Sequence, residues 1–156
     1  MRLLLVFTFC LLHFTSSAQP VPIKIKPLRD YYFVGQGIQL KNGINCFAIT
    51  DRETFHKFFG KTNRPDTPAF ATEIMLVMLM PESKQDAELK FDKVDMKAGN
   101  FIEVYCSNKL SKGRLTYSTY PIAVCTIPRY KGVAKLNFYN AGNMRLIQRV
   151  ELKEER

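Results

Sequence analysis

Histidine and cysteine, which supply many metal sites and catalytic sites, are scarce in this sequence. Its 156 residues include two histidines and four cysteines. Only His56 lies outside the apolar N-terminal stretch, and no serine or cysteine stands near it to serve as a nucleophile. A zinc site needs three or four suitably spaced cysteine, histidine or carboxylate ligands, which these scattered residues do not provide. The sequence therefore predicts no enzyme, no cofactor and no metal site, and we interpret His56 as shielding an apolar helix face.

Cysteine is also odd in number once the N-terminal stretch is set aside. Cys46, Cys106 and Cys125 remain, each in an apolar, strand-like context. In an oxidising compartment such a set allows at most one internal disulfide and leaves one thiol over. We interpret all three as buried thiols that act as small hydrophobic side chains, with one disulfide as the alternative.

The N-terminus lacks an apolar run long enough to cross a membrane. Leu3–Phe14 holds about a dozen apolar residues, where roughly 20 are needed to span a bilayer. Arg2 precedes this run and small residues follow it, which is the pattern of a secretory signal peptide. We therefore predict that residues 1–18 are a signal peptide cleaved before Gln19 and that the protein is exported, either periplasmic or secreted. An N-terminal membrane anchor is the alternative.

Acidic residues are too few to balance the basic ones. The chain has 23 Lys and Arg against 14 Asp and Glu, and its formal charge of +9 falls to +8 when Arg2 is removed with the signal peptide. For an exported protein, nucleic acid is not the expected partner. Acidic glycans, lipid headgroups or an acidic protein surface fit this charge better. The alternative is that scattered lysines only keep the domain soluble.

The one long apolar run in the rest of the chain is Ile74–Met80, closed by Pro81. Seven consecutive apolar residues leave no polar face, and the run is too short for a buried helix. It therefore predicts a central strand covered on both sides. Its methionines suggest a soft-metal site, but on a strand Met75 faces away from Met78 and Met80, so we interpret them as core side chains.

One helix and about eight short strands are expected around this central strand. Thr50 and Glu53 form a capping box, phenylalanines follow at helical spacing, and Gly60 fits a C-cap, which together predict a helix over residues 51–59 packed on a sheet. In the N-terminal half, the other predicted features are strands at 23–26, 31–34, 38–41 and 46–49, with a hairpin turn at 42–43. In the C-terminal half, they are a turn at 82–86, a polar loop at 107–113, and a strand-like run over 115–127 that bends at 120–121, where Pro121 indicates an edge or a bulge. A final hairpin through 141–142 is predicted to place Met144, Leu146, Val150 and Leu152 on one face.

These elements predict an α+β fold with a mostly antiparallel sheet, because the connections are short. A half-closed barrel is the alternative. We expect residues 19–45 to form an extended lead-in with the first strands, residues 46–152 to form a single domain, and residues 153–156 to fray.

A candidate binding surface lies in the C-terminal half, where tyrosines stand near basic residues. Tyrosine and arginine are enriched where protein surfaces bind one another. The residues that we single out are Tyr117, Tyr120, Arg129, Tyr130 and Lys131.

The order of these pieces resembles a known family. A short strand enters a capped helix (CFAITDRETFHKFFG), Phe70 leads into the apolar strand, and a Tyr-Pro precedes another apolar strand that ends in a basic residue (TYPIAVCTIPR). Residues 46–129 thus resemble the PrcB-like C-terminal domain family of exported bacterial proteins. The sequence departs from that pattern at Ala69, where an acidic residue is expected, and at Glu82–Glu88, which replaces a glycine-rich aromatic segment.

The resemblance implies a role as partner and stabiliser of a secreted protease. Our first hypothesis is therefore an exported, non-enzymatic interaction domain that binds another secreted or envelope protein. The alternative is a module that binds glycans or lipid headgroups through its basic surface. The identity of the partner and the oligomeric state stay open.

Overall fold

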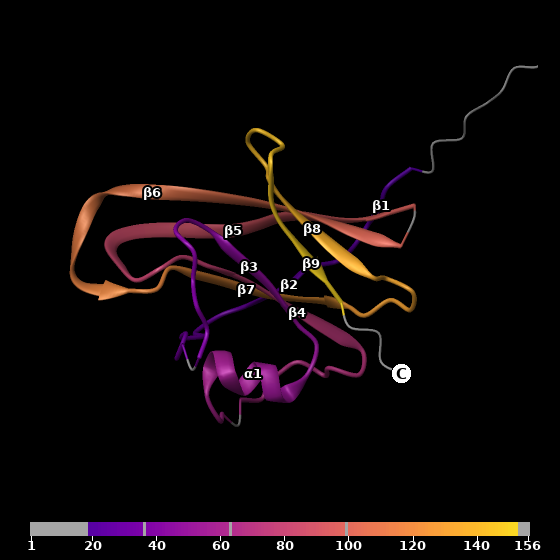
Figure 1. Cartoon of the computed structure of the whole chain (residues 1–156), viewed down its shortest axis with the longest axis horizontal. Coiled ribbons are helices and arrows are strands. Elements are labelled where there is room, and N and C mark those ends of the chain that lie inside the picture. The colour runs from indigo at the N-terminus through magenta and orange to yellow at the C-terminus, as the bar shows by residue number, and fades with distance from the viewer. Residues whose placement is uncertain (1–18, 36, 63, 99, 153–156) are drawn as a thin grey trace, which may run out of the picture.

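The computed structural model describes residues 19–35, 37–62, 64–98 and 100–152, so the predicted signal peptide and C-terminal tail lie outside the described residues. In the described part, nine strands form two sheets, with the orders β1-β5-β6-β8-β9 and β2-β7-β4-β3 (Figure 1). The elements are β1 (Val21–Pro22), β2 (Lys26–Leu28), β3 (Asn45–Ile49), α1 (Arg52–Phe59), β4 (Glu73–Leu79), β5 (Ser83–Lys97), β6 (Phe101–Thr119), β7 (Ile122–Pro128), β8 (Lys135–Asn140) and β9 (Leu146–Glu151).

The molecule has three layers, and α1 covers the outer face of the four-stranded sheet (Figure 1). One hydrophobic cluster lies between the two sheets and includes Leu76, Ile102 and Phe138. A second cluster lies between the four-stranded sheet and α1 and includes Phe55 and Phe58. Two apolar interiors therefore share the four-stranded sheet as their common wall.

Strand β4 separates these two interiors. It pairs with β3 on one side and β7 on the other, both antiparallel. Its residues at 74, 76 and 78 face the five-stranded sheet, those at 75, 77 and 79 face α1, and all six are 0% exposed. The predictions of a central strand covered on both faces and of opposed methionines are confirmed, because Met75 lies under α1 whereas Met78 and Met80 lie between the sheets.

Helix α1 forms as predicted but begins with a different cap. The Asp51 side chain, and not that of Thr50, accepts the first free amide, from Thr54 at 2.7 Å. Glu53 does not reach back to Thr50 but forms an ion pair with Lys57 one turn later, at 2.7 Å. Gly60 ends the helix at a φ of 74°, a backbone conformation that costs glycine little.

Among the described strands the chain passes from one sheet to the other four times, and at two of these crossings a proline lies between the strands. Pro81 lies between β4 and β5, and Pro121 lies between β6 and β7. The amide of Met80 donates to the carbonyl oxygen of Pro121 at 3.0 Å, which holds the two crossings side by side. The predicted bend at residues 120–121 is a full break, because β6 ends at Thr119 in one sheet and β7 begins at Ile122 in the other.

The predicted fold class is confirmed as α+β, with two corrections. The five-stranded sheet is mixed, because β8 runs parallel to β6. Neither sheet closes into the half-closed barrel that the sequence also allowed. The lead-in supplies an edge strand to each sheet, since β1 pairs with β5 and β2 with β7.

Several local predictions are wrong. No strands form over residues 31–34 or 38–41, and the expected hairpin at Asn42–Gly43 is a loop whose backbone is bonded by the side chain of Asn45. The expected turn at 82–86 and polar loop at 107–113 belong largely to β5 and β6. In the last hairpin a register shift after Phe138 leaves Met144 and Leu146 exposed.

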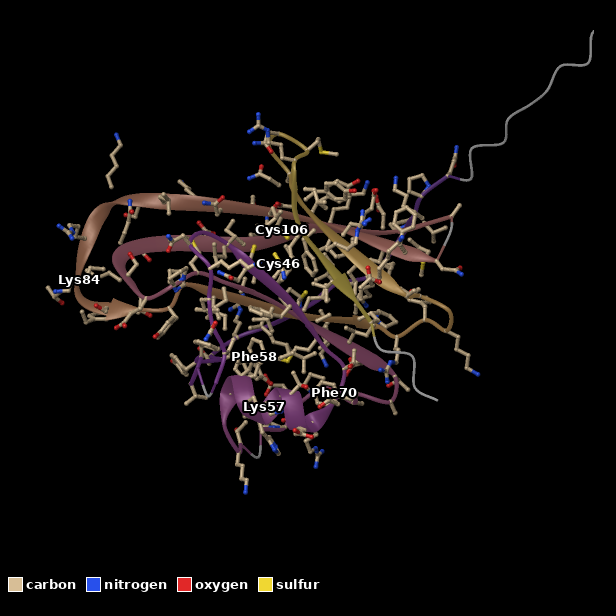
Figure 2. All side chains as sticks on the ribbon, viewed as in Figure 1. Cys46, Lys57, Phe58, Phe70, Lys84 and Cys106 are labelled. Carbon is tan, nitrogen blue, oxygen red and sulfur yellow. The ribbon has the colours of Figure 1, made fainter. Side chains whose placement is uncertain are left out.

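The three cysteines are free and buried. The thiols of Cys46 and Cys106 contact each other across the interior between the sheets (Figure 2). Their mutual hydrogen bond and then burial raise the pKa of Cys106, while burial raises the pKa of Cys125. Neutral thiols in these positions pack as small apolar side chains.

The double burial of β4 gives a direct test of the fold. Leu76→Ala removes apolar contacts from a fully buried position and should lower the free energy of unfolding by about 2–5 kcal/mol. The matched change Leu146→Ala, at a side chain that is 48% exposed, should cost about 0.5 kcal/mol. Urea unfolding monitored by circular dichroism measures both values. Similar losses for the two variants would contradict this description of the core.

Candidate functional site

Strands β5 and β6 continue as a two-stranded ribbon beyond the strands that flank them. Strand β8 pairs with β6 only over residues 101–106, and β1 pairs with β5 only at residues 95 and 96. The ribbon, defined as residues 83–90 of β5 and 107–119 of β6, projects past the rest of the molecule on the left of Figure 1. Its outer part carries Lys84 (Figure 2). No described strand lies along the β6 edge of the ribbon.

The direction of the free backbone groups on this edge follows from the last bond to β8. The amide of Ala141 donates to the carbonyl oxygen of Cys106 at 2.8 Å, after which the chain turns away. Because successive residues of a strand point their backbone groups to alternate sides, those of Asn108 and Leu110 face the same open edge. Ser107 and Lys109, opposite Lys90 and Glu88, face β5 instead. Each outward-facing residue offers one donor and one acceptor to an added strand.

The side chains of the ribbon are mostly exposed on both of its faces. Leu110 is 48% exposed and Tyr117 is 64% exposed, so apolar surface stands in water there. The β6 part has no acidic residue, and its basic residues are Lys109, Lys112 and Arg114. An isolated two-stranded ribbon is only marginally stable in water. The length of this ribbon therefore adds little to the stability of the free protein, and a bound segment would add to it.

The residues of the predicted binding surface do not form one patch. Tyr117 lies on the ribbon, and Tyr120 is half-buried against Phe33, with ring centroids 5.2 Å apart. Arg129, Tyr130 and Lys131 follow the opposite end of β7. The seven residues of β7 separate the two groups by roughly 20 Å. Arg129 donates to the carbonyl oxygen of Phe70 at 2.9 Å and thereby ties the end of β7 to the loop before β4.

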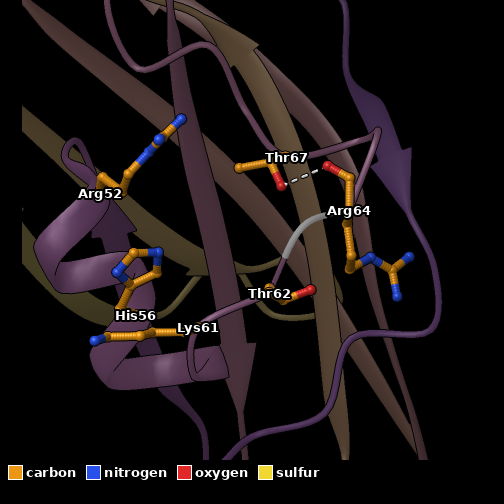
Figure 3. Close-up of a pocket in the computed structure, with 6 residues that line it drawn as sticks. All are labelled: Arg52, His56, Lys61, Thr62, Arg64 and Thr67. Carbon is orange, nitrogen blue, oxygen red and sulfur yellow. Dashed lines mark hydrogen bonds between the residues drawn. The ribbon is translucent and has the colours of Figure 1, made fainter.

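A second feature is a polar cleft of about 290 Å³ between α1 and the loop that follows it. Figure 3 shows the six residues that line it: Arg52, His56, Lys61, Thr62, Arg64 and Thr67. Arg52 and His56 lie one turn apart on α1, beside the face that buries Phe55 and Phe58, and the centroid of the His56 ring is 5.9 Å from that of Phe55. The loop supplies the other four residues and forms the facing wall.

Arg64 fixes this loop to the lead-in. Its guanidinium donates to both carboxylate oxygens of Asp66, at 2.9 and 3.0 Å, and to the carbonyl oxygens of Arg29 and Asp30, at 2.8 and 2.6 Å. It also stacks on the ring of Tyr31, 4.3 Å from the centroid. The hydrogen bonds from Arg64 lower the pKa of Asp66, whereas burial raises the pKa of Tyr31. The loop wall is therefore held by a bidentate ion pair and two backbone contacts.

Two kinds of feature are absent from the described part of the chain. No three histidine, cysteine or carboxylate side chains gather there closely enough to hold a metal ion. No helix among the same residues has the length and apolar character needed to cross a membrane.

Sequence reasoning missed both the ribbon and the cleft. Residues 107–113 alternate polar side chains with a single leucine and include a glycine, a pattern as typical of a loop as of an exposed strand. Only pairing with β5 makes them a strand. For the cleft, the sequence contained only a partial indication. The spacing of Arg52 and His56 makes them neighbours on the surface of the predicted helix. The loop residues opposite them carry no local pattern.

Comparison with known proteins adds no family to these observations. No family model matches the chain, no curated protein matches it, and no solved structure matches it. The resemblance to the PrcB-like C-terminal domain family therefore stays a prediction, and so does the protease-partner role that it implies.

The exposure of the ribbon predicts its dynamics. Backbone amides at residues 108–118 should exchange with deuterium at least about 100-fold faster than those at residues 74–79, because the ribbon lacks a buried face and β4 is buried on both. Hydrogen-exchange mass spectrometry with peptides from the two strands measures the ratio. Equal protection would mean that the ribbon is covered in the free protein.

Proposed function

We propose that this protein is an exported, non-enzymatic interaction domain, and that it binds an extended segment of another exported protein along the open edge of β6. The single observation that carries the proposal is the unpaired edge that begins at Ser107, where β8 turns away. A strand added there continues the five-stranded sheet in the place that β8 leaves free. Backbone hydrogen bonds supply affinity in this mode of recognition, and side-chain contacts supply selectivity.

The charge of the ribbon specifies the chemistry of that partner. The whole ribbon has five basic residues against Asp86 and Glu88, and the β6 part that forms the open edge has three basic residues and no acidic one, so an acidic segment is attracted and a basic segment is repelled. Leu110 and Tyr117 offer exposed apolar surface beside these charges. The partner segment that fits is therefore extended, acidic, and equipped with at least one apolar side chain.

The resemblance to the PrcB-like C-terminal domain family favours a secreted or envelope protease as the owner of this segment. In that role the domain would stabilise or modulate the protease and perform no chemistry of its own. The proposal for the binding edge does not depend on the partner being a protease.

A second candidate function is the binding of acidic glycans or lipid headgroups. A different region favours it, namely the basic cleft beside α1, which lies apart from the ribbon. The two functions use different residues and can be separated by substitution.

The open edge is tested by Asn108→Pro. Because the amide of Asn108 faces outward, proline removes a donor to the partner without removing a bond to β5. With the tagged chain 19–156 as bait in an envelope extract, Asn108→Pro should reduce retention of the partner by about tenfold or more. Quantitative mass spectrometry of the retained proteins measures the loss.

The matched control is Asn108→Ala, which changes the same side chain and keeps the amide. It should retain the partner as the unmodified chain does, and both variants should melt within about 5 °C of the unmodified chain. Equal retention by the proline and alanine variants would contradict strand addition at this edge. If neither variant retained the partner, binding would depend on the Asn108 side chain, which would also contradict strand addition.

A further inference from the structure

The cleft beside α1 holds basic side chains that no acidic group neutralises. Arg52 and Lys61 have neither a hydrogen-bond partner nor an ion-pair partner among the described residues. Elsewhere in the molecule, basic side chains near carboxylates do pair, as Lys57 does with Glu53 and Lys93 with Asp95, at 2.7 and 2.6 Å. None of the described residues that line the cleft carries a free carboxylate. The cleft therefore concentrates positive potential.

The walls of the cleft are held in place before any ligand binds. On one side, α1 is anchored by Phe55 and Phe58, which are 0% and 4% exposed beneath it. On the other side, the loop is fixed through Arg64, and the hydroxyl of Thr67 donates to the carbonyl oxygen of Arg64 at 2.8 Å (Figure 3). A ligand thus meets donors whose supports are already ordered, which lowers the entropic cost of binding.

The lining defines the class of ligand. Pockets for drug-sized molecules are typically larger than about 300 Å³ and mainly apolar, whereas this cleft measures about 290 Å³ and is lined by basic and hydroxyl side chains. Arg52 provides a planar fork of N–H donors, Lys61 a point charge, and His56 and Thr62 one further donor each. These donors match several oxygens that share a negative charge on a small group, and the exposed Arg52 and Lys61 side chains, which extend in different directions in Figure 3, must turn toward such a group to contact it together.

We propose that this cleft binds a tetrahedral oxyanion, a phosphate or sulfate ester carried on a sugar or on a lipid headgroup, with Arg52 and Lys61 as its charged contacts. His56 and Thr62 donate to the remaining oxygens, and the Arg64 guanidinium keeps its contacts with Asp66 and the lead-in. This inference rests on the second candidate function and is independent of strand addition at β6.

The test is an NMR titration of the ¹⁵N-labelled chain 19–156 with inorganic phosphate and with glucose 6-phosphate. Both should shift the amides of residues 52–62 in a saturable manner. The double variant Arg52→Ala/Lys61→Ala should weaken binding by about tenfold or more, since it removes two charge-assisted contacts. A cleft whose amides do not shift up to about 10 mM phosphate would overturn the proposal.

A charge-matched control separates a site from general attraction. Lys84→Ala/Lys112→Ala also removes two positive charges, but from the ribbon. It should leave the phosphate affinity within about twofold of that of the unmodified chain. Equal weakening by both double variants would show that only net charge matters and would overturn the proposal. Asn108→Pro should bind phosphate as the unmodified chain does. Partner retention therefore tests strand addition alone, and the phosphate titration tests the cleft alone.

Vesicles distinguish the two sources of the ester. If the ligand is a lipid headgroup, phosphatidylcholine vesicles containing about 20% phosphatidic acid should retain the unmodified chain and release the Arg52→Ala/Lys61→Ala variant. If the ligand is a soluble ester, glucose 6-phosphate should bind more tightly than inorganic phosphate and the vesicles should retain neither chain. Retention of both chains equally would assign vesicle binding to another surface and would overturn the lipid form of the proposal.

Discussion

The burial of β4 on both faces is the constraint on which the rest of the structure depends. A strand with six consecutive side chains at 0% exposure must have a cover on each side, or it exposes apolar surface to water. The five-stranded sheet covers one face and α1 covers the other. The prolines after β4 and before β7 then send the chain from one sheet to the other, so that the long β5–β6 hairpin can lie across the first face.

This arrangement leaves the two candidate functional regions on separate parts of the same scaffold. The ribbon is the part of β5 and β6 that extends beyond their neighbours, and the cleft lies between α1 and the loop that follows it. Neither region contributes a residue to the two large apolar clusters except Leu89 at the base of the ribbon. Both can therefore vary in sequence with little effect on the core, as is common for binding surfaces held on a rigid fold.

The sequence predicted the elements that depend on local patterns. The apolar run at 74–80 and the phenylalanine spacing at 55–59 each require one kind of element, and both formed. Predictions failed where one of several nearby polar side chains decides the local conformation. The Asn45 side chain bonds the backbone around Gly43 and replaces the expected hairpin, and Asp51, not Thr50, caps the helix by accepting from the amide of Thr54.

The candidate site was less accessible to sequence reasoning than the fold. Tyr117 and Tyr130 are exposed, but they lie about a strand length apart, Tyr120 is half-buried, and binding by any of the five residues stays a prediction. Their separation follows from the direction of β7, which adjacency in sequence does not reveal. The open edge of β6 exists because β8 pairs with only the first part of this longer strand. The sequence of β6 alone does not show where its pairing with β8 ends.

The most direct test of strand addition is hydrogen exchange on the complex captured from the envelope extract. Our account predicts that partner binding slows exchange at the amides of Asn108 and Leu110, which face the open edge, and leaves those of α1 unchanged. Slowed exchange at α1 or at residues 129–131, with the β6 edge unaffected, would contradict it.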